Sequence, residues 1–160
     1  MKRKGLVLLL CLICMTAFSA CGQPDSIDIS AYRDKEIVLS GAAKEEIKLT
    51  VGDLAEMECV TKKTHSTSDK IGEVRATGPL LDTILKPYGV KQEDFEKIEI
   101  LASDGYEIKL MQDFLKENPI IVTFGIDGKP LDQESAPLRI IIPESDSAYW
   151  IRKVNQIKFY

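Results

Sequence analysis

Ile98-Glu99-Ile100-Leu101-Ala102-Ser103-Asp104-Gly105-Tyr106-Glu107-Ile108 is the stretch that decides the fold of this chain. Apolar residues alternate with polar ones on both sides of a Ser-Asp-Gly break. Alternation with a period of two is typical of half-buried strands, and Asp-Gly accepts the positive φ that a tight turn needs. The stretch therefore predicts an antiparallel hairpin whose turn lies at residues 103–105.

Similar short patterns extend outward from this hairpin in both directions. Further strands are expected at residues 36–40, 47–49, 58–64, 72–77, 120–126, 138–142 and 150–160. The apolar run at 138–142 lies between two prolines and predicts a central strand.

Brief helices are expected between the strands. One follows Thr50, which can cap it together with Asp53, and another opens at Gly78 with Pro79 at its first helical position. Shorter helical turns are expected at 92–95 and 112–116. Many short strands with two or three brief helices predict an α+β domain that is mainly antiparallel sheet.

The composition limits the class of protein. The chain has 160 residues, of which 44% are apolar, enough for one domain with a real core. Its formal charge is −4, but the first 20 residues hold three cations and no acid, so the rest carries a formal −7. A domain this acidic repels phosphate, and no nucleic-acid partner is expected.

The first 21 residues have the order of a secretory signal. Lys2-Arg3-Lys4 is followed by an apolar run over residues 6–17, which is shorter than the roughly 20 residues of a membrane-spanning helix, and then by Ser19-Ala20-Cys21. The whole resembles a bacterial lipoprotein signal peptide. That resemblance implies lipid attachment, with acyl chains such as palmitate, at Cys21. An ordinary cleaved signal and an uncleaved anchor are the alternatives.

This resemblance implies a division of the chain and a location. Residues 1–20 would be the signal peptide, residues 21–35 a polar tether, and residues 36–160 the domain. The mature protein would be lipid-anchored at the extracytoplasmic face of the cell membrane. The protein would then contact the membrane through its N-terminal lipid anchor. Any protein or small-molecule partner stays unidentified.

Cys59 would be the one free thiol left after signal removal and lipidation. No intramolecular disulfide can then form. Cys59 lies on an expected strand near Lys62 and Lys63, which could favour a reactive thiolate. The favoured interpretation is a small buried hydrophobic residue, because free cysteine is among the most buried residue types.

Three other side chains are candidates for binding. Arg139 begins an otherwise apolar strand and Arg152 follows Trp150-Ile151, so each needs an anionic partner, either an acid of the fold or a bound ligand. An internal acid is the favoured partner. His65 lies among hydroxyl residues at an expected hairpin tip, but a zinc site needs three or four converging ligands.

Motifs for other chemistry do not stand out. The sequence has no glycine-rich phosphate loop and no Gly-x-Ser-x-Gly elbow. Its acidic pairs fall on faces that look solvated, whereas paired catalytic carboxylates need one desolvated member. The sequence leaves the catalytic residues unknown.

Several short motifs follow one another in order along residues 36–160. They are Leu49-Thr50-Val51-Gly52-Asp53-Leu54, Thr77-Gly78-Pro79-Leu80-Leu81, Ala102-Ser103-Asp104-Gly105-Tyr106, Asp127-Gly128-Lys129-Pro130-Leu131, Ala136-Pro137-Leu138-Arg139-Ile140-Ile141-Ile142-Pro143 and Trp150-Ile151-Arg152-Lys153-Val154. In this order they resemble the sulfite oxidase-type molybdopterin-binding oxidoreductase domain.

The resemblance implies a mixed α+β fold and a molybdenum cofactor held by one protein cysteine. Cys59 falls in the region of that metal ligand, and Arg152 and Arg139 match positions that contact or support the cofactor. The chain departs from the family after Cys59, where the usual Arg or Gly-Trp does not follow, and before Ile37, where a segment with Asn and His would help enclose the pterin.

Two interpretations of function follow from these departures. The preferred one is an extracytoplasmic lipoprotein whose domain has a reduced cofactor site, binds no cofactor and serves as a binding or accessory module. The alternative is a minimal molybdopterin-dependent oxidoreductase that transfers oxygen atoms or reduces sulfoxides, with Cys59 on the metal. Whether the chain is an enzyme stays open, and so does a solute- or partner-binding role unrelated to redox chemistry.

Overall fold

The hairpin at the centre of the sequence forms as its pattern predicts. The computed structural model describes residues 27–68 and 72–160. Within them, strand β5 (Lys97–Ala102) pairs antiparallel with β6 (Glu107–Met111), and Ile100 lies opposite Ile108. Gly105 takes a φ of 91° in the turn, a conformation that a residue without Cβ adopts without strain.

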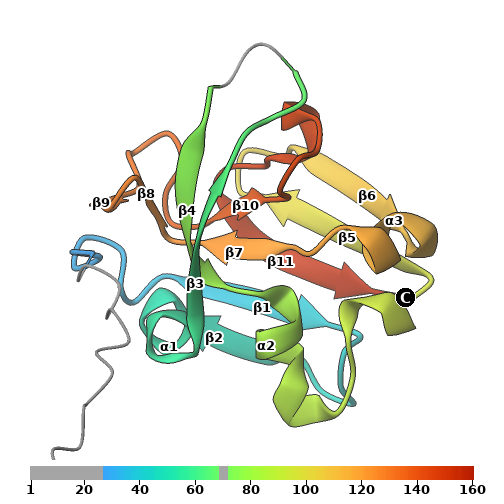
Figure 1. Ribbon diagram of the computed structural model, residues 1–160. Helices are drawn as coiled ribbons and strands as arrows, with labels where there is room; N and C mark the ends of the chain where they lie inside the picture. The colour runs from blue at the N-terminus through green and yellow to red at the C-terminus, as the bar shows by residue number, and fades with distance from the viewer. Residues whose placement is uncertain (1–26, 69–71) are drawn as a thin grey trace, which may run out of the picture.

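This hairpin is one edge of a five-stranded sheet in the order β2-β1-β11-β5-β6. Strand β1 (Glu36–Ser40) pairs antiparallel with β2 (Ile47–Thr50), and β11 (Val154–Phe159) pairs antiparallel with β5. The β1 and β11 strands are parallel to each other. The first and last strands of the domain therefore meet in the middle of its main sheet (Figure 1).

Two smaller sheets complete the β structure. One has the order β3-β4-β8-β9, with bounds β3 (Cys59–Thr64), β4 (Val74–Pro79), β8 (Gly125–Ile126) and β9 (Lys129–Pro130). The other pairs β7 (Ile121–Thr123) with β10 (Arg139–Ile141). Every residue of β7 and β10 is buried, so the apolar run at 138–142 is interior as predicted, although β10 pairs only with β7.

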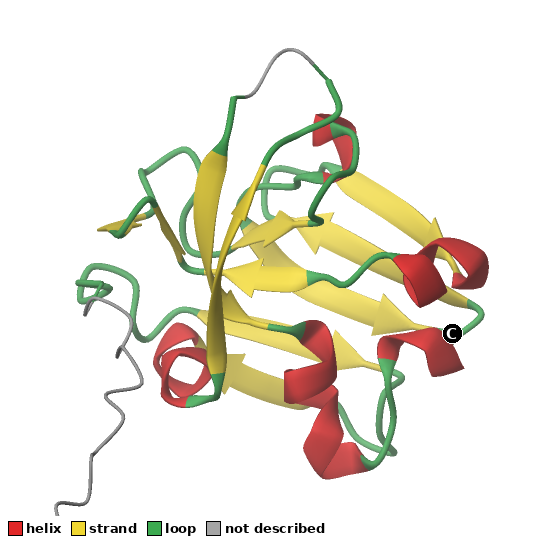
Figure 2. Ribbon diagram, in the orientation of Figure 1, coloured by secondary structure: helices red, strands yellow, loops and turns green. Residues whose placement is uncertain are grey.

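Short helices pack on one side of the main sheet (Figure 2). They are α1 (Val51–Glu56), α2 (Leu81–Leu85) and α3 (Gln112–Glu117), with 3-10 turns at Lys86–Tyr88, Gln92–Asp94 and Ser147–Tyr149. Helix α1 begins with the predicted capping box, in which the Asp53 amide donates to Thr50 Oγ1 at 3.0 Å and the Thr50 amide donates to Asp53 Oδ2 at 2.7 Å. The α+β class, mainly antiparallel, is confirmed.

Pro79 does not open a helix, and that prediction is wrong. Pro79 is the last residue of β4 and lies opposite Cys59 of β3, and α2 begins two residues later at Leu81. Gly78 beside it allows a close approach, because a Cβ there would come within 2.0 Å of the Val122 carbonyl oxygen. The Gly-Pro pair therefore serves strand packing rather than helix initiation.

The packed domain includes residues 27–35, which were expected to belong to a tether. Ile29 and Tyr32 are buried in the core. The Tyr32 hydroxyl donates to the Phe124 carbonyl and accepts from the Leu131 amide, both at 2.8 Å. The domain boundary expected at residue 36 therefore does not hold, because a buried tyrosine with both hydrogen bonds satisfied fixes this segment to the fold.

The expected signal peptide and its lipid-attachment residue, Cys21, lie outside the described residues. No helix within residues 27–68 and 72–160 is long and apolar enough to cross a membrane.

Candidate functional site

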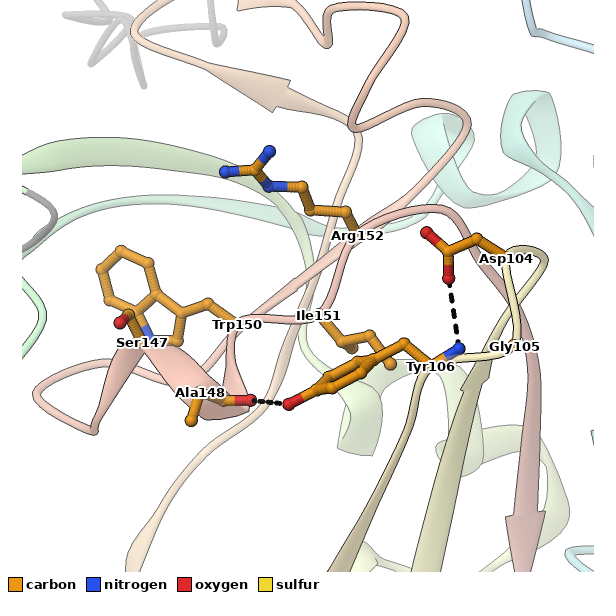
Figure 3. Close-up of a pocket in the computed structure, with 8 residues that line it drawn as sticks. All are labelled: Asp104, Gly105, Tyr106, Ser147, Ala148, Trp150, Ile151 and Arg152. Carbon is orange, nitrogen blue, oxygen red and sulfur yellow. Dashed lines mark hydrogen bonds between the residues drawn. The ribbon is translucent and has the colours of Figure 1, made fainter.

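A pocket of about 590 Å³ opens between the β5–β6 turn and the segment that follows β10. Figure 3 shows the residues of its wall, which come from two parts of the chain. They are Asp104, Gly105 and Tyr106 from the turn, and Ser147, Ala148, Trp150, Ile151 and Arg152 from the later segment.

Hydrogen bonds fix the two sides of this pocket to each other. The Tyr106 hydroxyl donates to the Ala148 carbonyl at 3.2 Å, and the Tyr106 amide donates to Asp104 Oδ1 at 3.2 Å, as the dashed lines in Figure 3 show. The Trp150 indole N–H donates to the buried Ile142 carbonyl at 2.8 Å. The two aromatic rings therefore form rigid parts of the wall.

A short chain of hydroxyl groups leads from the end of β3 to the pocket. Ser66 Oγ is buried and lies 3.0 Å from Ser68 Oγ, which lies 2.6 Å from Ser147 Oγ in the pocket wall. Ser66 Oγ also donates to the Ser145 carbonyl at 3.3 Å. These contacts orient the Ser147 hydroxyl, a group that can donate or accept a hydrogen bond.

Arg152 supplies a positive charge to the pocket wall. Its side chain is 47% exposed, and its Nη1 lies 3.5 Å from Glu134 Oε2. The Glu134 side chain is 81% exposed, so this ion pair is screened by water and contributes little to stability. Arg152 is therefore held in place only weakly by its own fold.

Arg139 lies next to this site and is the more unusual of the two arginines. It is only 8% exposed, and its guanidinium carbon lies 5.9 Å from the centroid of the Trp150 ring. Its Nε is a buried polar atom without a hydrogen-bond partner, and no acid among the described residues forms an ion pair with it. Burial lowers the pKa of Arg139, the charge of Arg152 lowers it further, and Asp132 opposes both effects.

Cys59 lies away from this pocket. It is the first residue of β3, and its half-buried Sγ faces the Leu54 carbonyl oxygen at 3.6 Å. Burial raises the pKa of the Cys59 thiol to about 11. Lys62 and Lys63 are exposed and do not produce the lowered pKa that a thiolate requires, so the favoured interpretation of Cys59 as a small packed residue agrees with this environment.

His65 follows β3 as an exposed side chain. The residues that the structure describes contain no cluster of three or more His, Cys, Asp or Glu side chains able to hold a metal ion.

The residues around this pocket fit an anionic group of a molybdenum cofactor, but they do not fit its metal-bearing end. Arg152 offers positive charge to an anionic group at the pocket wall, and the buried Arg139 adds a second positive charge next to Trp150. The metal end would need a cysteine facing the same pocket, but Cys59 does not line it, and its Sγ faces the Leu54 carbonyl oxygen instead. The described residues therefore do not fit the metal-bearing group.

Of the expected site residues, the structure brings together the two arginines and leaves Cys59 apart. Sequence reasoning missed Tyr106, Ser147 and Glu134. Tyr106 belongs to the Asp-Gly turn that the sequence predicts, which is the signal that could have found it. Nothing local in the sequence indicates that Glu134 lies beside Arg152.

Comparison with known proteins agrees with this fold. A sequence search of curated proteins finds no match. Among solved structures, the chain is similar to the sulfane dehydrogenase SoxCD from Paracoccus pantotrophus, with a TM-score of 0.67 and 16% sequence identity. That similarity covers 80% of this chain and 38% of the SoxCD chain, and at this identity it shows a shared fold.

The family described as oxidoreductase molybdopterin binding domain matches residues 24–160. This range covers nearly the whole chain and includes the segment before β1 that packs on the domain. The sulfite oxidase-type resemblance seen in the sequence motifs is confirmed. The chain belongs to the molybdopterin-binding oxidoreductase domain family.

Proposed function

We propose that this protein is a membrane-anchored extracytoplasmic lipoprotein whose domain binds a small anionic ligand and has a reduced cofactor site. The observation that carries the binding proposal is the buried side chain of Arg139, whose Nε has no hydrogen-bond partner among the described residues and which lies beside the pocket that Arg152 lines. The signal-like order of residues 1–21 supports the anchor.

The energetics of burial favour an anionic ligand. An uncompensated charge inside a protein costs several kcal/mol, so buried charges are normally paired. Arg139 lacks such a partner, and its neighbour Arg152 adds a second positive charge at the pocket wall. A ligand oxyanion would offset the burial of Arg139 and accept hydrogen bonds from the Arg152 fork.

The pocket has the size and lining of a small-molecule site. Its volume of about 590 Å³ suits a small organic ligand, and Tyr106 and Trp150 supply aromatic surface. Ser147 adds a hydroxyl group at the wall. We expect the ligand to be a small molecule that carries a carboxylate, sulfonate or phosphate group next to an apolar or flat part.

A minimal molybdopterin-dependent oxidoreductase is the second candidate. Family membership favours it, as does the positive charge at Arg139 and Arg152. In that case Cys59 would have to bind the metal, although it does not line the pocket beside Arg152 and its Sγ faces the Leu54 carbonyl oxygen. The geometry of Cys59 therefore favours the binding module.

Metal analysis of protein purified from its own host separates the two candidates. We expect no stoichiometric molybdenum, and the same result for the folded Cys59→Ser variant. Stoichiometric molybdenum in the natural protein that is lost in Cys59→Ser would contradict the binding-module proposal. Retained β-sheet circular dichroism in the variant controls for unfolding.

A further inference from the structure

We propose that Glu134 is a built-in competitor for the anion at Arg152, so that a ligand must displace the Glu134 carboxylate to bind. This inference rests on the proposed anion site and names how that site is regulated. The residues involved belong to the loop at 131–136. In this loop Asp132 lies near Arg139, and Glu134 lies near Arg152.

Both ends of this loop are fastened to the fold. The Leu131 amide donates to the buried Tyr32 hydroxyl at 2.8 Å. At the other end, the Lys153 amide donates to the Ser135 carbonyl at 3.1 Å. Because Lys153 is the neighbour of Arg152, this bond places Glu134 beside the Arg152 side chain.

Asp132 gives the loop its internal shape. The Ser135 amide donates to Asp132 Oδ1 at 2.8 Å, and the Ala136 amide donates to the Asp132 carbonyl at 2.8 Å. The backbone around Glu134 is therefore ordered, while the Glu134 side chain itself remains free to leave Arg152.

The loop provides negative charge near both arginines, and its ion pair between Glu134 and Arg152 stays exposed. Glu134 reaches Arg152 at 3.5 Å, and Asp132 acts on Arg139 through its charge alone. Glu134 and Arg152 are 81% and 47% exposed, so their contact is weak enough for a ligand to replace. Glu134 would then turn into solvent, where its charge is hydrated.

Trp150 allows a direct test, because it is the single tryptophan of the chain and lies in the pocket wall. Sulfate can be titrated at constant ionic strength while Trp150 fluorescence is followed. We expect Glu134→Gln to bind sulfate about two- to fivefold more tightly than the natural protein, the range that an exposed ion pair supports.

Glu117→Gln is the matched control, since Glu117 is exposed and forms no ion pair with another described residue. It removes the same charge from the molecule and should leave sulfate affinity unchanged. Arg152→Ala should weaken binding, and adding Glu134→Gln to Arg152→Ala should then have no further effect, as a double-mutant cycle requires for a direct pair.

The possible results separate the proposed role of Glu134 from the proposed anion site at Arg152. Equal sulfate affinities for Glu134→Gln and Glu117→Gln, with binding still lost in Arg152→Ala, would overturn the role of Glu134 and leave the anion site standing. If neither the natural protein nor Glu134→Gln binds sulfate or phosphate, the proposed anion site is wrong, and the proposed role of Glu134 is wrong with it.

Discussion

At the scale of single residues, two side chains stand out: a buried arginine and a half-buried cysteine whose pKa values both differ from the ordinary ones. Arg139 is a buried cation without an ion-pair partner among the described residues, and Cys59 is a half-buried thiol whose pKa is raised. The first points to a ligand, and the second describes a thiol that keeps its proton at neutral pH. Each gives a measurable consequence.

Replacing Arg139 tests whether its charge serves binding rather than stability. An apolar side chain of similar length avoids the cost of burying an unpaired guanidinium. We expect Arg139→Met to leave the free energy of unfolding unchanged or to raise it by up to about 2 kcal/mol, while sulfate binding weakens at least tenfold. Urea denaturation and Trp150 fluorescence measure the two effects.

Arg152→Met is the matched control for that variant. Its side chain is half exposed, so we expect a change in unfolding free energy within about 0.5 kcal/mol and weaker sulfate binding. A loss of several kcal/mol in Arg139→Met would show that Arg139 has a structural partner and would contradict the anion site.

The raised pKa of Cys59 predicts a pH dependence with a definite sign. The thiol ionises near 9 in the unfolded chain and at about 11 in the folded domain. Below pH 9 the thiol keeps its proton in both the folded and the unfolded state, and its contribution to the free energy of unfolding is fully present. As the pH rises toward 11 the unfolded state loses its proton first, so stability falls.

The measurement compares the natural protein with Cys59→Ser in urea denaturation between pH 8 and 11. We expect the natural protein to lose more unfolding free energy over that range than the variant, and its thiol to react slowly with iodoacetamide at pH 7. Rapid alkylation at pH 7 in the folded protein would instead indicate a thiolate and contradict the raised pKa of Cys59.

At the scale of elements, close packing between sheets explains features that local propensity does not. Gly78 lies in β4, and β4 passes directly over β7, with the Phe124 amide donating to the Thr77 carbonyl at 3.0 Å. This contact joins the two smaller sheets and thereby supports β10, from which Arg139 extends.

Adding a methyl group at Gly78 should disrupt this junction. A Cβ there would lie 2.0 Å from the Val122 carbonyl oxygen, and backbone cannot move aside as easily as a side-chain tip. We expect Gly78→Ala to lower the free energy of unfolding by about 2 kcal/mol or more. Thermal and urea denaturation measure the loss.

Gly72→Ala is the control, because no atom of the described residues lies within 4 Å of a Cβ built at Gly72. Its effect should stay within about 0.5 kcal/mol. Similar losses in both variants would mean that chain flexibility rather than the β4–β7 contact determines the cost.

At the scale of the whole molecule, the position of the domain relative to a membrane depends on the proposed anchor. The described fold begins at Ile27 and lies six residues after Cys21. A stretch this short spans at most about 21 Å. A lipid on Cys21 would therefore hold the domain close to the bilayer surface.

Intact mass spectrometry of protein from membranes tests the anchor. We expect a mature chain that begins at Cys21 and carries added acyl mass, and we expect Cys21→Ala to leave the membrane fraction. Cys59→Ser is the control, since it removes a cysteine from the domain and should keep the acyl mass. A mature chain that begins at Cys21 without acyl mass would contradict the proposal.

Local sequence patterns were enough to predict the short elements of this protein and its family. The β5–β6 hairpin, the capping box of Thr50 and Asp53 and the buried run at 138–142 follow from the periodicity and turn chemistry of neighbouring residues. Such signals act over a few residues and are present before any tertiary contact forms.

Three features depend on long-range packing: the parallel pairing of β1 with β11, the burial of Tyr32 in the core and the composition of the pocket. It separated Cys59 from the arginines and placed Glu134 beside Arg152. These relations join residues far apart in the chain or depend on how one loop is fastened. They arise from burial and long-range hydrogen bonds, for which a local sequence pattern has no counterpart.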